Sequence, residues 1–176
     1  MLKREPRKML GVYDNFPVNI HRIESFSTNF SNKKLQQRLI RVLCEINCRT
    51  FSFEKIACPT VPDCTIMFEA GLAEAESFNF LDEEEAKKVF VALKRTPFRT
   101  MDFFCVVRYY KGITEKAPLK FDYYMLRAIF SKNSVEIQVF HERGPRYISP
   151  GDVISFLVNM INETSRRKIL KKTGTV

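Results

Sequence analysis

Apolar and polar residues alternate in five segments of the chain, which is the period of a strand with one buried face. In one of these segments, Phe78 and Phe80 have the same parity as Phe68 and are therefore expected on the same face. Glu74 and Glu76 interrupt that face, so a bend, a bulge or a turn is expected between the two halves of the segment. The predicted strands cover residues 17–28, 64–81, 101–110, 121–130 and 135–140.

Three other segments repeat their apolar residues at the spacing of a helix with one buried face. The clearest covers residues 33–48, and Ser31 is its candidate N-cap. Asp82 begins the second helix, because the acidic run 83–85 suits the positive end of a helix dipole. Ser149, which a proline follows, begins the third.

The predicted elements follow one another in the order β-α-β-α-β-β-β-α, which favours the α+β class. Three consecutive strands and the lack of Gly-rich strand-to-helix turns predict an antiparallel sheet of four to five strands with helices packed on one face. We expect a basic N-terminal arm at residues 1–15, a single α+β domain at 16–163 and a basic C-terminal tail at 164–176.

The composition agrees with one folded domain. The 176 residues are 45% hydrophobic and 28% charged, which excludes a disordered chain. No apolar run approaches the ~18 residues of a membrane span, and the N-terminus lacks the apolar segment of a secretory signal. The expected location is intracellular, either cytoplasmic or nucleoid/nuclear, and no membrane partner is expected.

Positive charge concentrates near both ends of the sequence. The formal net charge is +9, of which the first ten residues carry +3 and a segment near the other end +5, so the middle is almost neutral. Basic end segments suit contact with a polyanion, most often nucleic acid, although they also occur as plain solubility tails. The candidate phosphate contacts are Lys3, Arg4, Arg7, Lys8, Arg166, Arg167, Lys168, Lys171 and Lys172.

The strand parity leaves one face of the predicted sheet, here called the outer face, rich in aromatic residues and arginine. Such a surface suits single-stranded nucleic acid, because bases stack on the rings while arginine meets phosphate or stacks itself. The loop 141–147 after the last strand adds two arginines and a tyrosine, although it also fits a plain rigid connection. The candidate nucleic-acid-binding residues are Phe104, Arg108, Tyr110, Phe121, Tyr123, Arg127, Phe140, Arg143 and Arg146.

Metal binding finds little support in the sequence. The odd number of cysteines, five, favours a reducing compartment. Cys44 and Cys48 have the spacing of a ligand pair, but Cys58 and Cys64 are too far apart for a second zinc pair. We therefore expect no metal site and no cofactor.

Catalysis is also disfavoured. Asp102, Asp122 and Glu136 lie on neighbouring predicted strands, as a two-metal carboxylate site would require. The parity, however, places Asp122 on the opposite face from the other two. No P-loop, dinucleotide fingerprint, nucleophile elbow or HExxH motif is present, so we expect no enzyme.

The sequence therefore predicts a non-catalytic protein that binds single-stranded DNA or RNA through the outer face and the basic ends. The alternative is a protein-interaction or homodimerisation module that uses the same face, because apolar surface patches are often interfaces. The sequence does not choose between DNA and RNA, and it leaves the oligomeric state open.

Overall fold

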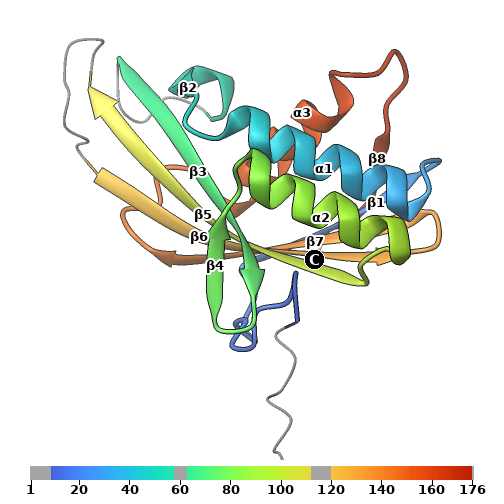
Figure 1. Cartoon of the computed structure of the whole chain (residues 1–176). Coiled ribbons are helices and arrows are strands. Elements are labelled where there is room, and N and C mark those ends of the chain that lie inside the picture. The colour runs from blue at the N-terminus through green and yellow to red at the C-terminus, as the bar shows by residue number, and fades with distance from the viewer. Residues whose placement is uncertain (1–8, 58–62, 112–119, 176) are drawn as a thin grey trace, which may run out of the picture.

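The computed structural model describes residues 9–57, 63–111 and 120–175. It has a mixed α+β fold, in which three α-helices cover one face of an eight-stranded antiparallel sheet (Figure 1). The predicted class and the antiparallel sheet are thus confirmed.

The helices begin where their capping residues predict. Ser31, Asp82 and Ser149 each accept a hydrogen bond from the backbone N–H three residues further on. The helices are α1 (Asn32–Ile46), α2 (Glu83–Arg95) and α3 (Pro150–Asn162), with one 3₁₀ turn at Phe53–Lys55. The strands are β1 (Arg22–Thr28), β2 (Thr50–Ser52), β3 (Cys64–Glu74), β4 (Ser77–Phe80), β5 (Thr100–Lys111), β6 (Lys120–Ser131), β7 (Ser134–Arg143) and β8 (Leu170–Thr175). Their order in the sheet is β2-β3-β5-β6-β7-β1-β8, and β4 pairs with β3.

The sheet has more strands than the sequence predicts. The segment 64–81 is a hairpin of β3 and β4, in which Glu74 pairs with Ser77. Because the turn has two residues, Phe78 pairs with Ala73 and shares its face of the sheet, which is the face of the odd-numbered β3 residues. The alternation in the sequence had predicted the opposite face, that of the even-numbered β3 residues. Phe78 and Phe80 therefore lie on the outer face and not in the core.

The segment 164–176, expected as a tail, contains the edge strand β8. Its first residue, Leu170, is buried and pairs with Thr28 of β1. The Asn162 side chain fixes Leu170 by donating to its carbonyl at 3.1 Å and accepting from its N–H at 2.9 Å. A strand whose only apolar residue is Leu170 has no two-residue period, so the sequence pattern could not reveal it.

Part of the predicted N-terminal arm is docked on the sheet. β3 and β5 pair only as far as Ala70 and Cys105, and residues 10–14 fill the gap beyond. The Gly11 N–H donates to Ala73 at 2.7 Å, and the Gly11 carbonyl accepts from the Asp102 N–H at 2.6 Å. Gly11 has φ +92° and lies against the Phe98 ring, so a side chain here would meet both strain and that ring.

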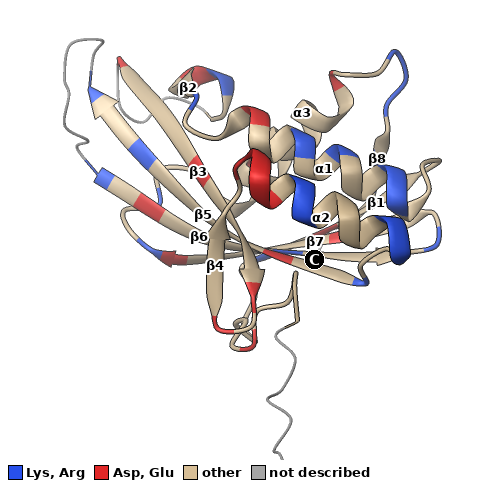
Figure 2. Ribbon diagram, viewed as in Figure 1, with Lys and Arg blue, Asp and Glu red and all other residues tan. Residues whose placement is uncertain are grey.

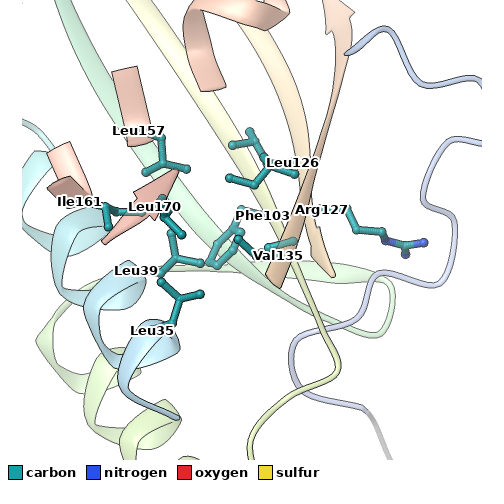
Figure 3. Close-up of a pocket in the computed structure, with 11 residues that line it drawn as sticks. Leu35, Leu39, Phe103, Leu126, Arg127, Val135, Leu157, Ile161 and Leu170 are labelled. Carbon is teal, nitrogen blue, oxygen red and sulfur yellow. The ribbon is translucent and has the colours of Figure 1, made fainter. Parts of the chain in front are cut away.

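The core lies between the sheet and the helices and agrees with the predicted strand parity. Leu35 and Leu39 of α1 meet Phe103 and Leu126 of the sheet around an apolar cavity of about 20 Å³ (Figure 3). Such a space holds about one water at most, so it is a small packing gap and not a ligand site. Arg127, on β6, points away from this cavity toward the other side of the sheet (Figure 3). Among the described residues, no helix is long and apolar enough to span a membrane.

Candidate nucleic-acid interface

The outer face carries the side chains that the strand parity predicted. Along β5 and β6, residues facing the helices are buried, while the alternate positions are mostly half-buried. Phe140 on β7 pairs with Met125 and follows the same alternation. The predicted residues on this face are Phe104, Arg108, Tyr110, Phe121, Tyr123, Arg127 and Phe140, and all seven are half-buried.

Five rings form a continuous line across the outer face, here called the aromatic row. The ring centroids of Tyr13 and Phe78 are 4.7 Å apart, and those of Phe78 and Phe104 are 5.4 Å apart. The line continues from Phe104 to Tyr123 at 5.9 Å and from Tyr123 to Phe121 at 6.4 Å. Sequence reasoning missed Tyr13, because it treated residues 1–15 as an arm, and Phe78, because it did not allow for the hairpin.

Two of the predicted arginines are neutralised by acids on the same face. Arg127 binds Asp102 through two parallel hydrogen bonds of 2.7 and 2.8 Å, and Asp102 is fully buried. Arg108 forms an ion pair with Glu69, whose hydrogen bond is the main reason why the pKa of Arg108 is raised. The Arg108 guanidinium also lies 5.8 Å from the Phe121 ring centroid. Neither arginine therefore brings a free positive charge to the face.

The Arg127–Asp102 pair also holds the N-terminal segment against the sheet. Asp102 accepts a hydrogen bond from the Tyr13 N–H at 2.8 Å. Arg127 lies 4.2 Å from the Phe16 ring centroid, which is within cation–π distance. This corner of the outer face is thus covered by the chain itself, and Arg127 acts as a structural residue there.

The free positive charge beside the aromatic row comes from Arg143. Its guanidinium lies 4.6 Å from the centroid of Tyr123, the residue it pairs with across β6 and β7. Arg143 is exposed and forms no ion pair within the described part of the chain. Phe140 is less accessible than predicted, because His21 stacks on it at 4.5 Å with an interplanar angle of 10°.

A buried network fixes the loop that follows Arg143. Asp122 is fully buried and accepts from the Tyr109 hydroxyl at 2.6 Å and from the backbone N–H groups of Arg146 and Tyr147 at 2.7 and 3.0 Å. Its fourth partner is His141 Nε2, at 2.7 Å. Burial is the main reason why the pKa of Tyr109 is raised, so this hydroxyl stays protonated and donates.

Gly144 allows the loop to approach Asp122 this closely. It has φ +115°, and a side chain would overlap the Phe121 carbonyl oxygen and the Asp122 carboxylate. Arg146, two residues further on, is exposed, has φ +61° and is fixed through its backbone N–H by Asp122. The predicted loop 141–147 thus begins later than expected: β7 extends to Arg143, and the loop presents Arg146, while Tyr147 is half-buried.

The basic ends do not meet the aromatic row within the described residues. Lys3, Arg4, Arg7 and Lys8 lie outside those residues. Arg166, Arg167 and Lys168 are exposed in the turn between α3 and β8, and Lys171 and Lys172 belong to β8, at the opposite edge of the sheet from β4. Lys172 pairs with the buried Glu24 at 2.8 Å and is not free.

The carboxylates considered for catalysis are separated as the parity predicted. Asp122 belongs to the helix side of the sheet and Asp102 to the outer face, and each is saturated by the partners described above. Among residues 9–57, 63–111 and 120–175, no three His, Cys, Asp or Glu side chains are grouped as a metal site.

The cysteines that the structure describes are free thiols. Cys48 is exposed and Cys44 half-buried, while Cys64 and Cys105 are buried. Burial raises the pKa of Cys105 to about 12. Cys58 lies outside the described residues. Searches against protein-family models, curated protein sequences and solved structures gave no match.

Proposed function

We propose that this protein binds single-stranded DNA or RNA without catalysis, and that unpaired bases stack along the aromatic row. The observation that carries the proposal is the row itself: its rings are half-buried, so each keeps part of its surface in solvent. A base has a π-face that stacks on such a ring, and each stacked base contributes about 1–3 kcal/mol.

Arg143 gives the row a contact for the nucleic-acid backbone. It is exposed, unpaired within the described residues and held beside Tyr123. A base that stacks on Tyr123 displaces this guanidinium from the ring, and the released guanidinium donates to the neighbouring phosphate. Because bases of every kind stack, and phosphates are the same throughout, this arrangement suits binding with little sequence preference.

The neutralised arginines favour a second candidate, a protein interface. With Arg108 paired to Glu69 and Arg127 to Asp102, the outer face carries less net charge than its arginine content suggests. Half-exposed aromatic residues with low net charge are typical of a subunit interface, as in a homodimer. Both functions use the same rings, so the effect of substituting a ring has to be measured both on single-strand binding and on the oligomeric state.

The test uses fluorescence anisotropy of a labelled single-stranded oligonucleotide with wild type, Tyr123→Ala, Arg143→Gln and the control Phe80→Ala. Phe80 is 48% exposed on the same sheet but makes no ring contact with the row. We expect Tyr123→Ala to weaken binding by about 1–3 kcal/mol, Arg143→Gln to weaken it and reduce its salt dependence, and Phe80→Ala to leave it unchanged.

Sedimentation of the same proteins decides between the two candidates. If Tyr123→Ala lowers the sedimenting mass and leaves single-strand affinity unchanged, the row is a subunit interface and the nucleic-acid proposal is wrong. If the mass is that of a monomer for wild type and variant alike and the affinity falls, the homodimer is wrong.

A further inference from the structure

Fold topology brings four sequence-distant basic segments to one end of the molecule, here called the basic pole. The segments are 27–34, 94–100, 130–134 and 164–171. They contain two, three, one and four Lys or Arg, ten in all, and no Asp or Glu. In Figure 2 the first turn of α1, the last turn of α2 and the turn between α3 and β8 are blue at the basic pole. The first turn of α2, which lies away from the pole, is red.

Backbone and side-chain contacts hold these segments together. The Gln36 side chain of α1 donates to the Phe98 carbonyl at 2.7 Å and accepts from the Phe98 N–H at 2.8 Å. The Phe130 N–H donates to Arg99 at 2.9 Å, and the Thr28 N–H donates to Asn133 at 3.0 Å. Thr28 also pairs with Leu170 of β8. Each of the four segments is therefore tied to another one.

The ten cations of the basic pole are all exposed. None of them forms an ion pair with any residue in the described ranges. α2 adds its own asymmetry, because its acids occupy the first turn and Lys94 and Arg95 the last. The four segments of the basic pole are thus free of acids, whereas the opposite end of the sheet carries both acids and bases (Figure 2).

We propose that the basic pole is a second nucleic-acid site, which binds the phosphodiester backbone of a duplex. The pole crosses five neighbouring strands, from β5 to β8, a width of about 19 Å at ~4.8 Å per strand. A duplex of that length carries roughly eleven phosphates, about as many as the pole has cations. Contacts to phosphates do not require an unpaired base, so binding at the basic pole does not involve the aromatic row.

Two observations favour a nucleic acid over other anionic partners. A lipid surface requires apolar anchors, and the exposed large apolar residues of the described chain, Met9, Val18, Phe80 and Val91, all lie outside the four segments. The number of cations over the width of the pole is also close to the number of phosphates in a duplex of that length. The proposal goes beyond the single-strand function, since the pole and the row lie on different parts of the molecule.

The test measures the salt dependence of binding to a short labelled duplex DNA. The pole variant is Arg99→Gln with Lys132→Gln, two exposed residues outside helices and strand interiors. The control is Lys55→Gln with Lys87→Gln, also exposed and outside the four segments. We expect wild type and control to bind alike, and the pole variant to lose about 1.8 from the slope of log K against log salt, at about 0.9 per phosphate contact.

An unchanged slope in the pole variant, or no duplex binding by wild type, overturns the proposal. So does pole-dependent binding of polyglutamate or of vesicles of anionic lipid in the absence of duplex binding, because the partner would then be an acidic protein or a membrane. Tyr123→Ala keeps this test separate from the single-strand function: it is expected to change single-strand affinity and to leave duplex affinity unchanged.

Discussion

Replacement of Asp122 by asparagine tests whether the buried carboxylate organises the loop that carries Arg146. The side chain is fully buried, and each of its oxygens accepts two hydrogen bonds. An asparagine keeps one oxygen and replaces the other with an NH₂ group, which can only donate. Whichever way the amide is oriented, its NH₂ group faces one backbone N–H of the loop, which cannot accept, whereas the other partner on that side, the Tyr109 hydroxyl or the His141 ring, can turn into an acceptor.

The magnitude follows from one lost contact and from three contacts whose partner is no longer charged. A hydrogen bond to a charged acceptor contributes about 1.5–3 kcal/mol and one between neutral groups about 0.5–1.5 kcal/mol, so the gross loss is roughly 4–6 kcal/mol. Burying a neutral amide costs less than burying a carboxylate, which offsets part of that loss. We expect Asp122→Asn to lower the free energy of unfolding by about 3 kcal/mol, a large share of the 5–15 kcal/mol typical of a domain.

Urea denaturation measures this loss, and hydrogen exchange of the Arg146 and Tyr147 amides localises it. Both amides donate to Asp122, so they are expected to exchange faster in the variant than in wild type. Glu142→Gln, at an exposed neighbour, is the control and is expected to stay within about 0.5 kcal/mol of wild type. A loss below about 1 kcal/mol in Asp122→Asn, with unchanged amide exchange, would mean that the Asp122 carboxylate does not organise the loop.

Three further predictions concern charge, pH and thiols. Arg127→Ala is expected to cost about 3 kcal/mol or more, because it leaves the fully buried Asp102 without its cation, whereas Arg108→Ala, whose ion pair is partly exposed, is expected to cost less than about 1 kcal/mol. Equal losses in urea denaturation would contradict this difference. Burial, then the charges of neighbouring groups, lowers the pKa of His21 below 6.5, so the unfolded chain binds the proton first and the contribution of His21 to stability is lost as the pH falls below about 6.5. An NMR titration that finds the pKa of His21 above 6.5 would show the opposite sign. Iodoacetamide is expected to label the exposed Cys48 in the native protein and the buried Cys105 only after unfolding. Peptide mass spectrometry of the labelled protein checks this order.

Local patterns were sufficient for the helices and the long strands. The caps at Ser31, Asp82 and Ser149 depend on contacts three residues away, and the two-residue period of β5, β6 and β7 depends on one buried face. β8 was missed because its pairing with β1 joins residues about 145 positions apart, and no local period marks it. Phe78 was misplaced because the parity across a hairpin depends on the length of the turn, which the sequence did not reveal.

The candidate site was predicted in its rings and less well in its charges. Parity alone places Tyr123 and Phe104 on one face, because alternation is a property of each strand. The pairing of Arg127 with Asp102 depends on the register between two strands, which the sequence analysis did not assign. The basic pole depends on tertiary contacts among four separate segments, so a sum of charge along the chain could not reveal it.

The most direct test of the central claim is an anisotropy titration of a labelled single-stranded oligonucleotide with wild type and Tyr123→Ala, at about 50 and 200 mM salt. Wild type is expected to bind the single strand, and to bind it more weakly at the higher salt concentration. Tyr123→Ala is expected to lose about 1–3 kcal/mol of affinity at both concentrations, because stacking does not depend on counterions. Equal affinity of the two proteins for the single strand, or no binding by wild type at the lower salt concentration, would contradict the proposed function.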